Sequence, residues 1–451
     1  TDPTYTPNNN GPATTGFAVV ATDNSSNPVP EGTIIIKGTG NYTGLVGLGS
    51  CEAFRSEHAE FEDASYAVSG GSFDHAILPE YCAEGFIPTQ NADGKYGVKV
   101  GVAEVNGAKY ETLQEAIDAA ARNATVTLLA NTRENVTIAK NITLDLNGYT
   151  INGGTVAGKA TVTVTARVTI KDSSASANEN GTGTIMREDT AENSGVSSHY
   201  VIDVQGGGWL MFEGGNVINH SGVVGVKGAS LVRIGDDSVD KYPGLTIKGG
   251  TFTQDNFIVI KVGRGYFTLN GGTLNSANTY AIENWFRATV KNGTVNGAVS
   301  SWTYSGGSNS TLEIIGGTIN GDVTSVNYGN ATDKKARVSV TGGTINGMLD
   351  TRSYDPATGD LTSINDATKA TIGITGGTFS TDPTKYVVED SAITENENGT
   401  FGVEKTYLAK VGETSYYTME EAFKAQTASG EAIVLLRDYT TGSTFNSGTK
   451  H

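Results

Sequence analysis

The 451-residue sequence has little cysteine, little proline and no long hydrophobic run. No stretch approaches the roughly 18 apolar residues of a membrane-spanning helix, so we expect no membrane insertion. Ten prolines beside 59 glycines favour many tight turns over a disordered linker. The two cysteines, Cys51 and Cys82, are too few for a zinc finger. They favour one disulfide formed in an oxidising compartment, with two buried thiols as the alternative.

Positive charge is also scarce. The sequence has 31 lysines and arginines against 48 aspartates and glutamates, which gives a net charge of −17. Nucleic acid is therefore an unsuitable partner. Scattered histidines argue against a Ser–His–Asp triad, and we expect neither a cofactor nor a metal, although a calcium loop stays open at Asp355, Asp360 and Asp366.

One short motif recurs through the middle of the chain. Gly-Gly-Thr-Ile-Asn-Gly begins at Gly316, and close copies begin at Gly249, Gly271, Asn292 and Gly342. A repeat of this length indicates a solenoid. The residues between copies alternate between apolar and polar, which is a strand pattern. The sequence therefore predicts an all-β, three-sided parallel β-helix in which glycine turns the corner and the apolar residue after threonine points inward.

The two ends of the chain repeat each other at a much longer interval. Residues 103–117 match 409–423, and 70–98 match 376–403, at offsets of 305 to 307. Thr112 and Glu115 form a capping-box pattern that predicts a short helix near 112–121. We expect this helix to cover the open end of a β-helix and to recur in each module.

These matches predict a string of modules. We assign 1–16 to an extended leader, 17–101 to the end of a preceding module and 102–405 to one complete module. Residues 406–447 would start a following module, and 448–451 resemble the remnant of a tag.

The opening of the complete module carries a family resemblance. The run from Tyr110 to Ile151, with the close at 376–386, resembles pectate-lyase-like right-handed β-helix modules of large repetitive surface proteins from gut Gram-positive bacteria. The resemblance implies a right-handed β-helix and an extracellular protein, secreted or attached to the cell wall. It leaves the activity open, because the superfamily contains lyases, hydrolases and adhesins without enzymatic activity.

Aromatic residues recur at one position of the repeat. Tyrosines stand ten residues after the motif threonine in three successive copies, and a second column precedes them by two residues. Tyrosine, tryptophan and arginine are enriched at binding hot spots, although an aromatic stack that only pads the fold is the alternative. The predicted binding residues are Trp285, Phe286, Trp302, Tyr304, Val326, Tyr328, Arg352 and Tyr354.

Three functions remain open from the sequence. The favoured one is a monomeric, adhesin-like module without catalytic activity that binds a host protein, such as immunoglobulin or an epithelial receptor, or a glycan. The alternatives are a polysaccharide lyase or glycoside hydrolase, and a structural spacer. Binding through the aromatic strip predicts that alanine at Trp302, Tyr328 and Arg352 abolishes binding with little loss of stability.

Overall fold

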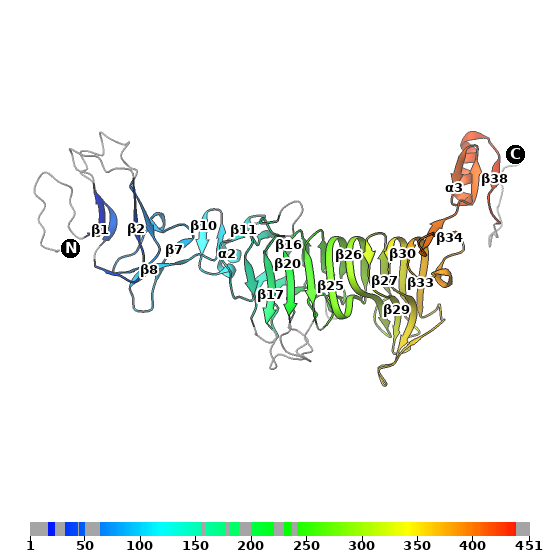
Figure 1. The fold of residues 1–451 in the computed structure, drawn as a ribbon, viewed down its shortest axis with the longest axis horizontal. Coiled ribbons are helices and arrows are strands. Elements are labelled where there is room, and N and C mark those ends of the chain that lie inside the picture. Colours follow the sequence, from blue (N-terminus) through cyan, green and yellow to red (C-terminus); the bar gives the residue numbers. More distant parts are fainter. Residues whose placement is uncertain are drawn as a thin grey trace, which may run out of the picture.

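The described part of this computed structural model is dominated by strands. It comprises residues 17–22, 32–43, 45–49, 64–154, 158–175, 181–188, 200–220, 230–236, 241–255 and 257–438. Two α-helices occur among these residues, α2 (Leu113–Ala119) and α3 (Met419–Ser429). Figure 1 shows an elongated body with β1 and β2 at one end and α3 at the other. The expected all-β class is confirmed.

Neither described helix has the length and apolar character required to cross a bilayer.

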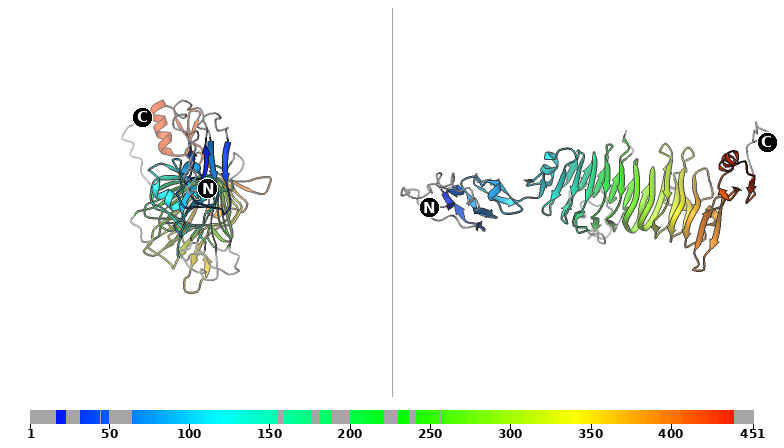
Figure 2. Two further views of the ribbon diagram at one scale, coloured as in Figure 1. Left: turned by 90° about the vertical axis from the view of Figure 1, so that its left-hand side faces the viewer. Right: turned by 90° about the horizontal axis from the view of Figure 1, so that it is seen from above.

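The central strands pair in parallel at a regular interval. From β12 to β21, each strand pairs with the third strand after it along the chain. These pairings divide the strands into three parallel strips, and Figure 2 shows the strands succeeding one another along the long axis. A long parallel sheet is therefore confirmed.

The three strips are defined by their members. Strip 1 contains β12 (Val136–Ile138), β15 (Val162–Val164), β18 (Ile202–Val204), β21 (Val232–Ile234), β24 (Ile260–Val262), β29 (Val323–Tyr328) and β31 (Leu349–Tyr354). Strip 2 contains β11 (Thr125–Leu128), β13 (Ile142–Asp145), β16 (Arg167–Lys171), β19 (Trp209–Phe212), β22 (Gly244–Ile247), β27 (Ser310–Ile314) and the first parts of β30 (Ala336–Ile345) and β33 (Ala370–Phe379). Strip 3 contains β14 (Thr150–Asn152), β17 (Thr184–Glu188), β20 (Asn216–His220), β23 (Thr251–Gln254), β28 (Thr318–Ile319) and the ends of β30 and β33.

Two long strands show how the strips are connected. Strand β25 (Tyr266–Asn284) pairs in turn with β22, β23 and β24, so it passes through strips 2, 3 and 1. Strand β26 (Arg287–Tyr304) follows the same path beside it. The chain therefore completes one circuit of the three strips in about the length of one sequence repeat.

The apolar residue of each motif copy lies in the core, as predicted. Val295, Ile319 and Ile345 follow the motif threonine, pair in register along strip 3 and have no exposed surface. Burying such a side chain contributes roughly 1.5–3 kcal/mol. The same position in successive repeats thus forms a continuous column of buried apolar side chains.

Glycine is required at the two corners that flank strip 3, because successive backbones approach closely there. The φ angle of Gly317 is +80°, a conformation that is strained for residues with a Cβ atom. A Cβ atom at Gly347 would lie 2.2 Å from the carbonyl carbon of Gly321. Beside this corner, the Asn320 amide donates to the Asn296 side-chain oxygen at 2.7 Å, and Asn346 donates to Asn320 at 2.8 Å.

Helix α2 has the predicted cap but ends two residues earlier than expected. The Thr112 hydroxyl accepts the Glu115 N–H, and the Glu115 carboxylate accepts the Thr112 N–H, so both bonds of the capping box form. Leu113, Ala116 and Ile117 are buried against the first strands. The helix therefore covers one end of the central core.

The two ends of the chain share one arrangement of elements. The hairpin β9 (Ala103–Val105) and β10 (Ala108–Tyr110) precedes α2, and β11 pairs antiparallel with β9. The hairpin β36 (Ala409–Val411) and β37 (Thr414–Tyr416) precedes α3, and β38 (Ile433–Leu435) pairs antiparallel with β36. Helix α3 also carries both capping-box bonds.

The closing segment is shared as well. Antiparallel strands β7 (Phe86–Gln90) and β8 (Tyr96–Val100) correspond to β34 (Ser391–Glu395) and β35 (Phe401–Lys405). A 3-10 helix precedes each pair, η2 (Pro79–Tyr81) and η3 (Thr384–Tyr386). The remaining strands are β1 (Phe17–Thr22), β2 (Gly32–Ile36), β3 (Asn41–Tyr42), β4 (Leu45–Gly49), β5 (Ala64–Val68), β6 (Ser72–Phe73) and β32 (Leu361–Ser363).

The division into modules stays a prediction, although the first strands resemble the central ones in pairing. Strands β1, β2 and β3 pair in parallel with β4, β5 and β6, again the third strand along. The proposed leader, 1–16, and the proposed tag remnant, 448–451, lie outside the described residues.

The predicted disulfide is not tested by this structure. Cys82 forms no disulfide with another described residue. Its Sγ lies 3.7 Å from the Leu78 carbonyl oxygen, and burial raises the pKa of its thiol to about 11. Cys51 lies outside the described residues, so its pairing stays a prediction.

Gly347→Ala should lower the free energy of unfolding by about 1–3 kcal/mol, because the new methyl group would overlap the backbone of Gly321. Denaturant-induced unfolding measures this change. Gly373→Ala is the matched control, since its Cβ atom would meet Val388 at an ordinary 3.6 Å. Equal stability of the two variants would contradict a steric requirement at the corner.

Candidate functional site

The predicted aromatic columns align as their spacing indicates. Tyr304, Tyr328 and Tyr354 are register partners on β26, β29 and β31. Trp302 is likewise paired with Val326, and Val326 with Arg352. Both columns stand on the outer face of strip 1, because the alternating positions between them belong to the interior.

The rings form one connected cluster on this face. The Trp285 ring stacks on Trp302 with centroids 5.3 Å apart, and Tyr328 stacks on Tyr354 at 5.1 Å. Trp285 meets Tyr304 and Tyr328 edge-on at 5.8 and 5.9 Å. Such contacts fix the ring orientations and create a preformed apolar wall.

Two of the residues that were predicted to contact a partner are buried. Val326 has no exposed surface and Trp302 is 6% exposed. The Trp302 indole N–H donates to Ser300 Oγ at 2.7 Å. Direct contact with a partner is therefore a wrong prediction for Val326. The expectation that Trp302 can be removed without loss of stability also conflicts with its burial, because its ring packs against Tyr280, Trp285 and Tyr354.

Phe286 belongs to a different cluster from Trp285. Its ring stacks on Tyr242 at 5.0 Å and meets Tyr266 at 5.7 Å. Residues 285 and 286 form the bend between β25 and β26, and their side chains join different ring clusters. Phe286 therefore does not belong to the ring cluster of Trp302, and its contact with a partner stays a prediction.

Arg352 and Tyr354 lie on β31, the last strand of strip 1. The Arg352 Nε donates to Asp350 Oδ2 at 2.9 Å, and Ser363 Oγ donates to the same oxygen at 2.5 Å. Although burial opposes it, hydrogen bonding by Ser363 and Arg352 holds the pKa of Asp350 below its ordinary value. This ion pair fixes Arg352 outside the group of residues that line the pocket described next.

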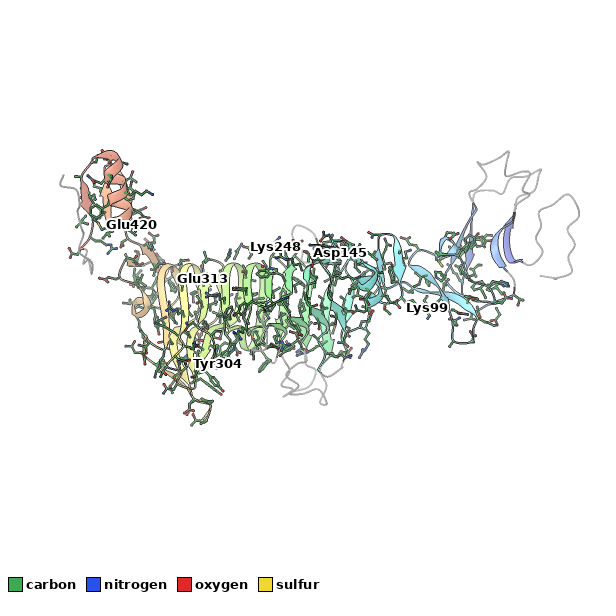
Figure 3. The ribbon with its side chains drawn as sticks, turned by 180° about the vertical axis from the view of Figure 1, so that it is seen from behind. Lys99, Asp145, Lys248, Tyr304, Glu313 and Glu420 are labelled. Atoms are coloured by element: carbon green, nitrogen blue, oxygen red, sulfur yellow. The ribbon has the colours of Figure 1, made fainter. Side chains whose placement is uncertain are left out.

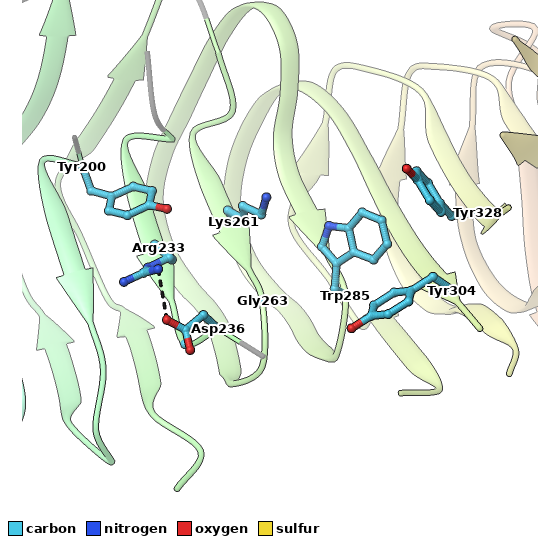
Figure 4. Close-up of a pocket in the computed structure, with 9 residues that line it drawn as sticks. Tyr200, Arg233, Asp236, Lys261, Gly263, Trp285, Tyr304 and Tyr328 are labelled. Atoms are coloured by element: carbon cyan, nitrogen blue, oxygen red, sulfur yellow. Dashed lines mark hydrogen bonds and ion pairs between the residues drawn. The ribbon is translucent and has the colours of Figure 1, made fainter. Parts of the chain in front are cut away.

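A pocket of about 310 Å³ opens beside the tyrosines. Figure 4 shows its charged residues on one side and Trp285, Tyr304 and Tyr328 on the other. Gly235 and Gly263 continue the column of Trp285 and Trp302, so the absence of their side chains leaves the hollow. The lining residues are Tyr200, Arg233, Gly235, Asp236, Lys261, Gly263, Trp285, Tyr304 and Tyr328.

Arg233 is the fixed cation of this pocket. Its Nε and Nη2 donate to the two carboxylate oxygens of Asp203 at 2.8 and 2.6 Å, and Nη1 donates to Asp236 at 3.2 Å. Its guanidinium also lies 4.6 Å from the centre of the Tyr200 ring. Burial disfavours its charge, but the hydrogen bonds and charge of Asp203 outweigh burial and raise the pKa of Arg233.

Glu283 is a nearly buried carboxyl group beneath the aromatic wall. Its Oε1 accepts the Trp285 indole N–H at 2.7 Å and lies 3.9 Å from Lys261 Nζ. Burial raises the pKa of Glu283, and Lys261 and the indole N–H only partly oppose the shift. Lys261 keeps 38% of its side chain exposed and can therefore reach a ligand.

The charged residues of the pocket were not predicted from the sequence. Asp203, Arg233, Lys261 and Glu283 are register partners at one outward position of strip 1. Each stands between residues that point inward, in Ile-Asp-Val, Val-Arg-Ile, Ile-Lys-Val and Ile-Glu-Asn. The available signal was a charged residue in the middle of three short strands and one near the end of β25. Unequal lengths of the intervening turns hid their alignment.

The acidic insertion near the end of strip 1 does not assemble a metal site. The Asp355 carboxylate accepts the Ala357 N–H, and the Asp366 carboxylate accepts the Thr368 N–H and hydroxyl. Among the described residues, no group of three or more histidines, cysteines or acidic residues could hold a metal ion.

Comparison with models of protein families, with curated proteins and with solved structures gives no match. The pectate-lyase-like resemblance therefore depends on sequence motifs alone. Functional conclusions must come from the chemistry of the pocket and of the outer faces.

Trp302→Ala should lower the free energy of unfolding by about 3 kcal/mol, because it removes a buried ring that contacts Trp285 and Tyr354. Thermal or denaturant melts measure the loss. The control is Tyr407→Ala, whose ring is 46% exposed away from strip 1. An unchanged melt for Trp302→Ala would show that the cluster contributes nothing to stability.

Glu283 should make stability decrease with rising pH. Its pKa is raised in the folded state, so the folded protein binds more protons than the unfolded chain above the ordinary glutamate pKa of about 4.3. The stability of the wild type relative to Glu283→Gln should be highest below that pH and should fall as the pH rises through the folded pKa. Parallel urea titrations across this range measure the difference, and a constant difference would contradict the raised pKa.

Proposed function

We propose that the chain is part of a modular, extracellular right-handed parallel β-helix protein that binds a glycan without catalysis. The parallel pairing of every third strand supports the solenoid. Right-handed crossovers are the rule for parallel strands, which supports the hand. The repetition of hairpin, capped helix and closing strands at both ends supports a string of modules.

The single observation that carries the binding proposal is the pocket between Arg233 and the aromatic wall. A volume of about 310 Å³ is at the lower end of small-ligand sites. Sugar rings present C–H groups that pack on aromatic faces and hydroxyls that pair with charged groups. Trp285, Tyr304 and Tyr328 supply the first kind of contact, and Asp236 and Lys261 supply the second.

The contacts around the pocket also favour a preformed binding surface over a smooth spacer. Arg233 is held by two carboxylates, and Trp285 is held by Glu283 and Trp302. Side chains that are fixed before a ligand arrives lose little conformational freedom on binding. A host protein that inserts a sugar or an aromatic side chain would occupy the same pocket.

Tyr304→Ala should weaken glycan binding about tenfold, because one stacking contact contributes around 1 kcal/mol or slightly more. A glycan array selects the ligand, and calorimetry with the chosen oligosaccharide measures the change. Tyr407→Ala is the matched aromatic control and should bind like the wild type. Undiminished binding by Tyr304→Ala, or no glycan bound by the wild type, would contradict this site.

A glycoside hydrolase or polysaccharide lyase is the second candidate, favoured by the raised pKa of Glu283. A carboxyl group whose pKa is raised by burial can act as a general acid toward a glycosidic oxygen. Incubating the protein with the glycan that it binds tests this directly. Cleavage that disappears in Glu283→Gln would replace binding with catalysis as the function.

A further inference from the structure

A second outer face, on strip 2, combines arginines with aromatic rings. Register partners at the first outward position run Arg167, Trp209, Gly244, Tyr266 and Arg287. Thr311 and Arg337 continue the same column. We call this series, with Tyr242 and Phe286 at its edge, the arginine–aromatic column.

The rings of this column form a shallow platform. Trp209 and Tyr266 lie 6.3 Å apart with their planes inclined by 27°, and both are 37% exposed. A Cβ atom at Gly244 would lie 2.6 Å from the Trp209 ring, so the indole lies flat over a glycine. Tyr242, 41% exposed, packs on Phe286 and Tyr266 at the edge.

The column is unusual in its charge. Arg167, Arg287 and Arg337 are exposed, and none of the three forms an ion pair within the described part of the chain, where Arg133, Arg233 and Arg352 do. The protein has a net charge of −17. Arg287 also lies over the Phe286 ring, with its guanidinium carbon 5.5 Å from the ring centre. Cations that have no ion-pair partner among the described residues and gather on one face of an acidic protein favour an anionic ligand.

The spacing of the arginines restricts that ligand. Strands in a sheet are about 4.8 Å apart, so four steps place Arg287 roughly 19 Å from Arg167, and two steps place Arg337 roughly 10 Å further. Uncharged rings fill the longer interval. A matching ligand has separated anionic groups with neutral sugar rings between them.

We propose that the arginine–aromatic column binds a sparsely sulfated glycan, with pyranose rings on Trp209 and Tyr266 and sulfate esters on the arginines. Guanidinium groups donate paired hydrogen bonds to such oxyanions. A sulfate ester stands one bond further from the ring than a carboxylate does, so it reaches an arginine on the next strand. A polyuronate carries a carboxylate on every sugar ring. Some of these carboxylates would lie over the aromatic side chains of the platform, where no arginine compensates their charge.

Calorimetry on the full chain tests the proposal with three probes. These are κ-carrageenan oligosaccharides, which carry a sulfate on every second ring, the same oligosaccharides after chemical desulfation, and oligogalacturonate. We expect the sulfated probe to bind at least about tenfold more tightly than either other probe, because charged hydrogen bonds are the strongest contacts available. Its affinity should fall as salt is added.

Variants separate this column from the pocket. The double variant Arg287→Gln and Arg337→Gln should weaken binding of the sulfated probe about tenfold. Trp209→Ala should weaken its binding as well. Lys424→Gln, an exposed charge on α3, is the matched control and should bind normally. Tyr304→Ala should also leave this binding unchanged, because Tyr304 stands on strip 1.

Three results would overturn the proposal. They are equal binding of the desulfated probe, equal binding of oligogalacturonate, and undiminished binding by the double arginine variant. Circular dichroism and thermal melts confirm that each variant is folded. Arg167→Gln, which changes an exposed side chain at the other end of the platform, provides an independent test if the double variant melts early.

Discussion

The structure depends on close stacking of one backbone circuit upon the next at the two glycine corners that flank strip 3. At Gly316, Gly321, Gly342 and Gly347 the neighbouring carbonyl group occupies the place of a Cβ atom, within 2.2 to 2.4 Å. This approach brings the parallel strands into register, and the register in turn places Ile319 and Ile345 in the core. The asparagine side chains beside the corner add hydrogen bonds from one circuit to the next.

Fixed register turns sequence positions into columns on the outer faces. On strip 1 the column of Trp285 and Trp302 reaches Gly235 and Gly263, and the loss of side chains produces the pocket. On strip 2 a single glycine, Gly244, lets the Trp209 ring lie flat. Small residues thus shape both proposed binding faces, while rings from neighbouring strands supply their walls.

Charge is distributed differently on these faces. In the pocket, Arg233 is compensated by Asp203 and Asp236, and Lys261 lies near Glu283, which suits a ligand without net charge. Exposed arginines without ion pairs on strip 2 suit an anion. Figure 3 shows Glu313 of strip 2 and Lys248, which directly follows β22, along one side of the body and Tyr304 along the other, so the two proposed faces lie on different sides.

The sequence by itself determined the all-β class, the inward apolar column, the capping box at Thr112 and the alignment of Tyr304, Tyr328 and Tyr354. Each of these follows from local rules: a Gly-Gly turn, an alternating strand and a fixed repeat length. A column position can therefore be counted directly along the chain wherever the repeat has no insertion.

Tertiary structure alone decided which members of a column are covered and which face a ligand. Val326 is fully buried, Trp302 packs against rings from other strands, and Phe286 joins a different ring cluster from Trp285. The alignment of Arg233 and Lys261 depended on turns of unequal length, which local patterns do not specify. Burial, pocket shape and the environment of Glu283 arise from contacts between distant residues, so only the folded chain reveals them.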